Sequence, residues 1–240
     1  MIVQACLNGA RPHDFHPRLP VSVEALAQDA AACVAAGAAE LHIHPRDRNG
    51  AESLGAVDVV ITAVRQACPG TLIGVSTGAW IEGDAARTRA AIAAWRDLPD
   101  HASVNLSEAD APAVMQILRD KGIGIEAGLA SVDDAERLVG LALHDRVLRT
   151  LVELEEQDVS EALGIADAIM AVLTRNGLRR PVLLHGFDAT VWPMVGQARQ
   201  RRWSVRIGLE DGRSMPDGAM ARDNADLVKA AVAMVSQTTP

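Results

Sequence analysis

The sequence has few cysteines and no long apolar run, and each absence excludes a class of protein. Its three cysteines, Cys6, Cys33 and Cys68, lie in apolar surroundings and show no CxxC spacing. This usage fits a reducing compartment and argues against a disulfide framework. No apolar stretch approaches the roughly 18 to 20 residues that span a bilayer, and no basic N-terminal region precedes an apolar one. We therefore expect a cytoplasmic protein without a membrane partner.

Basic residues are also scarce relative to acidic ones. The 240 residues include 23 Lys and Arg against 31 Asp and Glu, a formal net charge of -8. Nucleic acids and anionic membrane surfaces would repel such a surface on average. We expect no nucleic-acid partner, and any anionic ligand must meet local arginines. Because no linker, low-complexity run or repeat interrupts the chain, we predict a single domain over residues 1–240.

Short apolar runs alternate with alanine-rich amphipathic segments along the whole chain, as is typical of βα units around a parallel sheet. One helix is predicted between Ser22 as N-cap and Gly37 as C-cap, another ends at 176–177, and the last lies near 220–237. Eight such units suit the length of a (β/α)8 TIM barrel, although a doubly wound open sheet is the alternative. The strands are predicted at residues 2–8, 40–45, 72–77, 102–107, 123–128, 147–155, 182–186 and 205–210.

Polar side chains gather at the carboxyl ends of these predicted strands. In a TIM barrel that end carries the chemistry, because the βα loops meet there. The candidates in chain order are Asn8, His42, His44, Ser76, Thr77, Asn105, Ser107, Glu108, Glu126, Glu153, His185, Arg206, Glu210 and Asp211.

The stretch ELHIHPRD contains the first candidate metal ligands. Successive side chains of a strand alternate between its faces, so His42 and His44 point the same way. On the eighth strand, Arg206 and Glu210 share a face by the same rule. Two imidazoles and one carboxylate with an open position form a common catalytic zinc site, and the set also suits non-haem iron. Ordinary barrel-lining histidines are the alternative that the spacing alone leaves open.

Several motifs in this order resemble the β-keto acid cleavage enzymes, the BKACE family. They are LNGAR, HPRLPVS, AGAAELHIHPRD, VSTG, ASVNLSE and VRIGLEDG, and they run from the first strand to the last. The resemblance implies a (β/α)8 barrel that binds a divalent metal, usually Zn2+, and is a homo-oligomer, here a dimer or tetramer. It implies His42, His44 and Glu210 as metal ligands, Arg206 with Asp211 as a catalytic dyad, and Ser76 and Asn105 in the substrate pocket.

The implied reaction needs these kinds of groups. A β-keto acid and acetyl-CoA would be converted into acetoacetate and a new acyl-CoA by condensation, CoA transfer and retro-Claisen cleavage. A Lewis-acidic metal can grip the keto and carboxylate oxygens, while Asp211, oriented by Arg206, would remove a proton from the carbon between the carbonyls. Ser76 and Thr77 would bind a carboxylate or oxyanion, with simple capping as the alternative.

The predicted substrate contacts include one departure from the family. Many members carry an acidic residue where this chain has Arg11, which would favour an anionic or neutral substrate tail. The chain is also shorter than typical members. The full set of expected substrate-binding residues is Asn8, Arg11, Thr77, Asn105 and Glu126, and the cations expected near the CoA phosphates are Arg11, Arg18, Arg46, Arg48 and Arg213.

Two histidine ligands and a carboxylate also suit other functions. A metal-dependent aldolase, decarboxylase or hydrolase acting on a keto acid would use the same set, and so would a non-catalytic metal-binding barrel. His185 is expected either to orient substrate or to bond the backbone. Trp192 and Trp203 are expected to pack.

Overall fold

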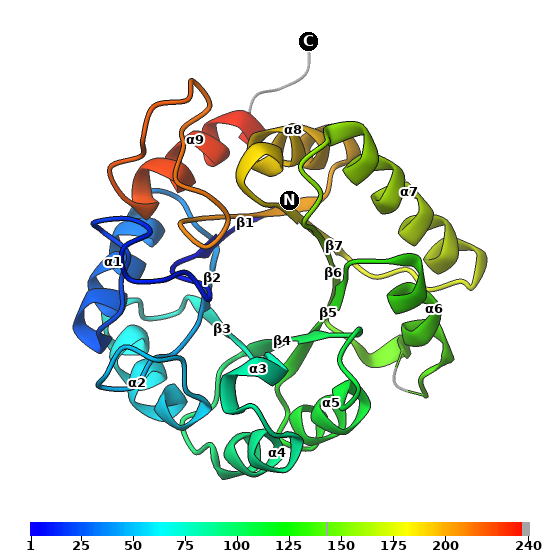
Figure 1. Cartoon of the computed structure of the whole chain (residues 1–240), viewed down its shortest axis with the longest axis horizontal. Helices are drawn as coiled ribbons and strands as arrows, with labels where there is room; N and C mark the ends of the chain where they lie inside the picture. Colours follow the sequence, from blue (N-terminus) through cyan, green and yellow to red (C-terminus); the bar gives the residue numbers. More distant parts are fainter. Residues whose placement is uncertain (143, 237–240) are drawn as a thin grey trace.

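A computed structural model describes residues 1–142 and 144–236 of the chain, and within them eight parallel strands close into a barrel in sequence order. Figure 1 looks down the barrel axis, with the ring of strands enclosed by helices. The predicted TIM barrel is therefore confirmed. The strands are β1 (Val3–Cys6), β2 (Glu40–Ile43), β3 (Leu72–Ser76), β4 (His101–Asn105), β5 (Gly124–Leu129), β6 (Arg149–Leu154), β7 (Val182–Gly186) and β8 (Ser204–Ile207).

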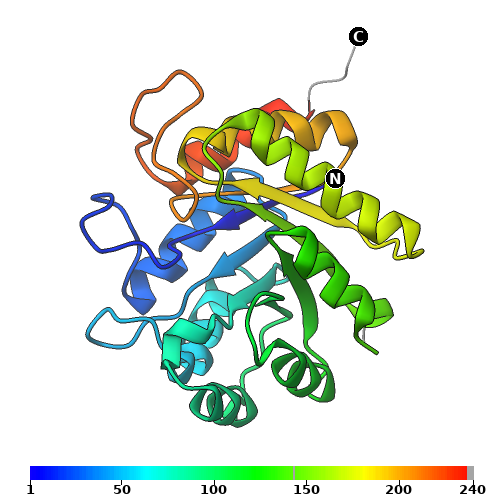
Figure 2. The same ribbon diagram turned by 45° about the vertical axis from the view of Figure 1, so that its right-hand side comes forward.

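Helices connect consecutive strands and cover the outside of the barrel (Figure 2). Ser22 caps the first helix through its hydroxyl, which accepts from Ala25 N at 3.2 Å, and Gly37 follows that helix with φ 108°, as its pattern predicts. The helices are α1 (Val23–Ala35), α2 (Val57–Ala67), α3 (Ala79–Glu82), α4 (Ala85–Ala94), α5 (Ala111–Asp120), α6 (Val132–Gly140), α7 (Val159–Arg175), α8 (Val191–Arg201) and α9 (Asn224–Ser236), with short 3-10 turns at Leu54–Ala56, His144–Arg146 and Asp188–Thr190.

The apolar core lies between the strands and these helices. Leu41 and Ile43 on β2 and Ile73 and Val75 on β3 are fully buried, together with Leu26 of α1. Alternation along β2 therefore points Leu41 and Ile43 outward, toward the helices. His42 between them and His44 just after the strand face the barrel interior. Cys6, Cys33 and Cys68 are all buried, free thiols. Among the described residues, no helix has the length and apolar character needed to cross a membrane.

The barrel interior below the catalytic end is filled by charged and polar side chains instead of aliphatic ones. Glu126 lies at the centre and pairs with Arg206 Nη2 at 2.6 Å and with Arg149 Nε at 3.3 Å. Gly74 leaves room for the layer, because a Cβ there would lie 2.2 Å from His101 Nε2. The arginines and carboxylates compensate each other, which a buried charge requires. The layer consists of Gln4, Glu40, His101, Glu126, Arg149 and Arg206.

Strand β8 is shorter than its sequence pattern predicts, since it ends at Ile207 and Glu210 belongs to the following turn. The turn begins where the chain passes very close to β1. A Cβ on Gly208 would lie 1.8 Å from Cys6 O, so only glycine fits there. Glu210 N then donates to Cys6 O at 3.4 Å. The turn carries Glu210 and Asp211 over the open end of the barrel.

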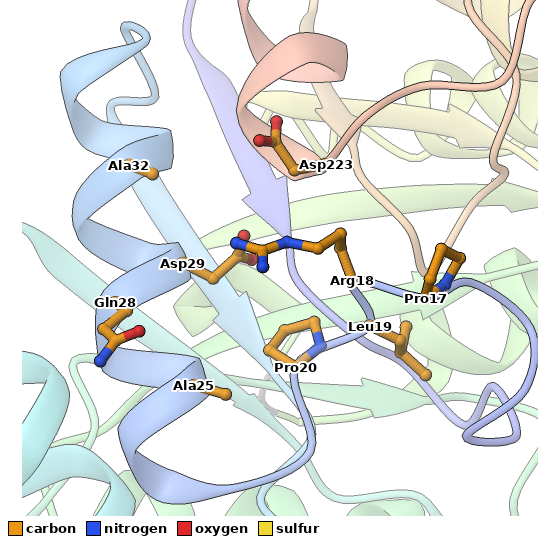
Figure 3. A pocket seen from close by; sticks show the side chains of 9 residues that line it. All are labelled: Pro17, Arg18, Leu19, Pro20, Ala25, Gln28, Asp29, Ala32 and Asp223. Carbon is orange, nitrogen blue, oxygen red and sulfur yellow. The ribbon is translucent and has the colours of Figure 1, made fainter.

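Asn224, the first residue of α9, holds this turn from behind. Its side chain is fully buried, donates to Leu7 O at 2.8 Å and to Asp29 Oδ2 at 2.6 Å, and accepts from Leu209 N at 2.7 Å. Asp29 lies beside a cavity of about 220 Å³ between α1 and the start of α9, with Arg18 and Asp223 around it (Figure 3). Burial raises the pKa of Asp29 to about 7, against the opposing amide of Asn224. This pocket lies outside the barrel axis.

Replacing Asn224 by alanine is expected to lower the free energy of unfolding by about 3 kcal/mol, because three buried groups lose their partner. Urea or guanidinium denaturation measures the change. Asn176→Ala is the control, since this exposed asparagine only donates to Val172 O at the end of α7. It should cost less than about 1 kcal/mol. Equal losses in the two variants would contradict the role of Asn224.

Candidate metal centre and active site

The carboxyl end of β2 and the turn after β8 bring the three predicted metal ligands together. His42 Nε2 lies 3.9 Å from Glu210 Oε2, and His44 Nε2 lies 3.6 Å from Glu210 Oε1. The two imidazole rings stand edge to face with centroids 5.2 Å apart. One ligand atom from each residue lies within 4.8 Å of the others. These donors converge on one point above the polar layer.

The arrangement fits a divalent cation on its own chemistry. Glu210 Oε2 is buried without a hydrogen-bond partner in the part of the chain that the structure describes. Burial alone would raise the pKa of Glu210, but His44 and Arg206 outweigh it and hold that pKa below its usual value. A buried, ionised carboxylate oxygen without a hydrogen-bond partner is costly unless a positive charge lies beside it. A cation between Glu210 and the two imidazoles would supply that charge. Two nitrogens and one carboxylate oxygen are a donor set that suits zinc and leaves positions open for substrate.

His44 is fixed through both its backbone and its ring. Asn8 Nδ2 donates to His44 O at 2.9 Å, and His44 N donates to Asn8 Oδ1 at 3.0 Å. Glu52 Oε1 lies 2.5 Å from His44 Nδ1. Burial lowers the pKa of His44, but Glu210 and Glu52 outweigh it and raise that pKa to about 9. The buried amide of Asn8 thus holds the ligand strand, and both of its polar ends are already engaged.

His42 is supported from the polar layer below. Arg206 Nη2 lies 3.2 Å from His42 Nδ1, and its Nε donates to Gln4 Oε1 at 2.6 Å. Burial and the Arg206 charge hold the pKa of His42 well below its usual value, so the ring is neutral as a metal ligand requires. Burial would lower the pKa of Arg206, but Glu126 outweighs it and raises that pKa. Arg206 therefore contacts His42 and Glu126, and it makes no hydrogen bond to Asp211 among the described residues.

Asp211 lies next to the metal ligands and is oriented by His185. The ring Nδ1 is 3.0 Å from Asp211 Oδ1, and Nε2 is 2.8 Å from Glu153 Oε2. Burial lowers the pKa of His185, but Asp211 and Glu153 outweigh it and raise that pKa to about 9. Burial raises the pKa of Asp211, with Glu210 adding to it and His185 opposing it. Asp211 Oδ2 is buried with no hydrogen-bond partner in the described chain, so this oxygen is free to accept a hydrogen bond or a proton.

The hydroxyls of Ser76, the last residue of β3, and of Thr77, the residue after it, are both buried and both bonded to the backbone. Ser76 Oγ accepts from Gly78 N at 3.3 Å, as the capping alternative predicts. Its own proton remains available to an oxyanion. Thr77 Oγ1 donates its proton to Ser103 O at 2.7 Å, so it can only accept from a ligand. The structure therefore distinguishes Ser76 as a hydrogen-bond donor from Thr77 as an acceptor.

Arg11 lies at the mouth of the barrel with most of its donors engaged. Its Nε donates to Glu210 O at 2.9 Å, and its Nη2 donates to Asp211 O at 3.0 Å and to Asp188 Oδ1 at 3.2 Å. The guanidinium also lies 4.3 Å from the centroid of Phe15. Arg11 thus braces the turn that carries the acidic site residues, a role that its sequence position does not indicate.

A cavity of about 380 Å³ opens above the metal ligands, and Arg11, Trp80 and Glu153 contribute to its wall. Asn105 lines a neighbouring cavity of about 80 Å³, whose wall also includes Glu153. Arg11 and Asn105 therefore each border a cavity at this end of the barrel. Glu126 is different, because it is fully buried beneath the site in contact with Arg206 and lines neither cavity.

Three contributors were not assigned these roles from sequence. Glu52 follows the two histidines in a loop, Trp80 lies on the short helix α3, and Glu153 is a polar candidate near the end of the sixth predicted strand. No local pattern identifies Glu52, since the antiparallel bridge between Arg46 and Glu52 brings it back to His44. For His185, the signal in the sequence is its position near the carboxyl end of the seventh predicted strand, where site residues gather.

Comparison with known proteins agrees with the motifs. An 81-residue stretch, 32% of this chain, is 32% identical to the 3-keto-5-aminohexanoate cleavage enzyme of Acetoanaerobium sticklandii and covers 30% of that protein. Among solved structures, a ternary complex of ObcA with a C4-CoA adduct and oxalate matches 89% of this chain and 62% of that chain, with a TM-score of 0.74 and 17% identity. A binary complex of ObcA with oxaloacetate gives a TM-score of 0.72 at 18% identity, again over 89% of this chain and 62% of that one.

The chain thus spans about three-fifths of the ObcA chain, and at this low identity the TM-score shows a shared fold alone. The match to a family description is far more extensive. Residues 1–239 match the beta-keto acid cleavage enzyme, BKACE, so the chain belongs to the BKACE family.

Proposed function

We propose that this protein is a metal-dependent β-keto acid cleavage enzyme that uses acetyl-CoA as co-substrate. The observation that carries the proposal is the convergence of His42, His44 and Glu210 beside Asp211, whose buried Oδ2 has no partner. Family membership supports the reaction, and the complexes of ObcA with oxaloacetate and with a CoA adduct support the ligand class.

His42, His44 and Glu210 would hold the metal, which as a Lewis acid supplies polarisation of the keto and carboxylate oxygens of a β-keto acid. Asp211 Oδ2 would take a proton from the carbon between the carbonyls. His185 holds the other oxygen of that carboxylate, and Glu153 holds His185, so the base keeps a fixed direction. Arg206 keeps His42 in place from below.

The carbanion carbon would then form a bond to the thioester carbonyl carbon of acetyl-CoA. Ser76 Oγ–H would donate to the oxygen on which negative charge develops. The adduct would then break its carbon–sulfur bond and expel CoA as the thiolate, which adds to the far keto carbonyl. Collapse of this second adduct breaks the bond between that carbonyl and the former carbanion carbon. Acetoacetate leaves with the returned proton, and the tail leaves as a new acyl-CoA. Asp211 would return that proton.

The substrate tail is proposed to meet the barrel mouth between Arg11 and Asn105. Arg11 Nη1 has no hydrogen bond in the described chain, which leaves its two N–H donors for an anionic or neutral polar tail. Among the cations expected near CoA, Arg46 is buried and donates to three backbone carbonyls, so it serves the fold. Arg18 lines the cavity beside Asp29, outside the barrel axis, and is not proposed to contact CoA. Arg213, exposed beside Phe15, and Arg48 remain as proposed phosphate contacts.

Zinc is the proposed metal, the cytoplasm the proposed location, and a dimer or tetramer the proposed assembly. The donor set supports zinc over magnesium or calcium, which prefer oxygen ligands. The paired imidazoles are the specific reason.

Metal analysis followed by a panel of β-keto acids tests the proposal. The purified protein should carry about one divalent metal per chain, and acetoacetate should form only when acetyl-CoA and a β-keto acid are both present. Acetoacetate and acyl-CoA are measured by mass spectrometry. An aldolase or hydrolase would form product without acetyl-CoA, and a protein without stoichiometric metal would contradict the site. Preference for cationic tails over dicarboxylic substrates would contradict the role given to Arg11.

A further inference from the structure

Two loops meet beside His44, one after β2 and one after β3. The first loop turns back on itself, since Arg46 and Glu52 form an antiparallel bridge and Ser53 N donates to Pro45 O at 2.9 Å. The second loop contains the short helix α3. Leu54 N donates to Glu82 Oε1 at 2.9 Å and ties the two loops together. Glu52 and Trp80 therefore face each other across this junction.

Glu52 uses one carboxylate oxygen for each loop. Its Oε1 lies 2.5 Å from His44 Nδ1, and its Oε2 accepts from Trp80 Nε1 at 3.0 Å. When Nδ1 carries the proton toward Glu52, the lone pair of His44 Nε2 faces Glu210 and the metal position. A carboxylate in this position fixes the tautomer and the orientation of a metal-ligating histidine. The indole N–H in turn restrains the carboxylate.

Trp80 itself is placed with little freedom although half of its surface is exposed. Its ring lies against the backbone of Gly78, where a Cβ would come within 2.3 Å of the ring. The ring is also nearly parallel to that of His44, with centroids 6.4 Å apart and an interplanar angle of 24°. The indole of Trp80 thus stacks against the imidazole of His44 and donates a hydrogen bond to Glu52, whose carboxylate contacts the same imidazole.

We propose that Trp80 is a positioning residue of the metal centre, which acts on His44 through Glu52. The inference rests on the metal site of the proposed function and needs no assumption about the substrate. A residue that only lined the cavity would not affect the metal centre through Glu52. The effect of Trp80, in contrast, must pass through the Glu52 carboxylate. That difference can be measured without turnover.

The test is a double-mutant cycle on Zn2+ affinity. Apo protein is titrated with Zn2+ against a chromogenic chelator at fixed pH, for the wild type, Trp80→Phe, Glu52→Ala and the double variant. Phenylalanine keeps an aromatic ring on Gly78 and removes the N–H donor. We expect Trp80→Phe to raise the Kd about tenfold and Glu52→Ala to raise it about 10- to 100-fold, the range for outer partners of metal ligands. The double variant should match Glu52→Ala within about twofold, because the path through Glu52 is already cut.

Trp192→Phe is the matched control. Its indole donates to Ser214 O on the outside of the barrel, and its loss should leave the Kd unchanged. Thermal unfolding of the apo proteins checks that each variant folds as the wild type does. An unchanged Kd in Trp80→Phe would overturn the inference, and so would a full tenfold effect in the Glu52→Ala background. A wild type that binds no Zn2+ would overturn the proposed function as well, which separates the two failures.

Discussion

Replacing Asp211 by asparagine is expected to lower kcat/KM for the β-keto acid by about 10³, within the usual contribution of a general base. Asparagine keeps the size of the side chain and its contact to His185, but it cannot accept a proton at Oδ2. The protein should keep its metal, since Asp211 is outside the set formed by His42, His44 and Glu210. Steady-state kinetics together with metal analysis of the same sample measure both quantities.

Asp217→Asn is the control for Asp211, because Asp217 is an exposed carboxylate on the same loop, bonded to Ala219 N. Its kcat/KM should stay within about twofold of the wild type. If Asp211→Asn retained a tenth or more of the activity with full metal content, another group would have to be the base. Loss of the metal in that variant would instead place Asp211 among the ligands.

Replacing Glu210 by glutamine is expected to abolish activity by removing the metal. The amide is a neutral, weaker donor and no longer balances a divalent charge between two imidazoles. We expect the Zn2+ Kd to rise by about 100-fold or more and kcat to fall to background at equal metal concentration. Metal stoichiometry after dialysis and kcat measured with added Zn2+ check the two effects separately. Treatment of the wild type with a chelator should give the same inactive state, and added Zn2+ should restore it.

Glu161→Gln is the matched control, because this exposed glutamate lies in the first turn of α7, away from the barrel axis. It should keep both metal and activity. Full activity of metal-free wild type would contradict the metal-dependent reaction. Full metal content in Glu210→Gln would show that the carboxylate is not required for binding.

The sequence predicted the ligand strand well because its signal is local. Alternation alone predicts that His42 and His44 point to the same face. Their place at the end of the stretch ELHIH predicts that they lie at the carboxyl end of a strand. Glu210 was expected to continue the alternation of Arg206 along an eighth strand. It instead lies in the turn that follows β8. This turn begins at Gly208, where the backbone passes so close to Cys6 O that no side chain would fit. Glu210 still comes close to His42 and His44, although it reaches them from a turn and not by alternation along a strand.

The pairing of charges could not be predicted in the same way. Arg206 was expected to orient Asp211, but it bonds Glu126 and His42 below the site, while His185 holds Asp211. Asn8 was expected to bind substrate, but its amide nitrogen and its amide oxygen are both hydrogen-bonded to the backbone of His44. These partners come from different strands, and their meeting depends on the stagger of the strands around the barrel.

The sequence by itself determined the TIM barrel, the end of it that carries the chemistry, and the three ligand candidates. These follow from periodicity, strand length and residue type, which act over a few neighbouring positions. Only the tertiary structure decided that His185 contacts Asp211, that Glu126 lies beneath the candidate site in contact with Arg206, and that Glu52 contacts both His44 and Trp80. Those contacts join residues brought together by barrel closure and by loop packing, and a buried carboxylate takes whichever partner the closed fold places within hydrogen-bond reach.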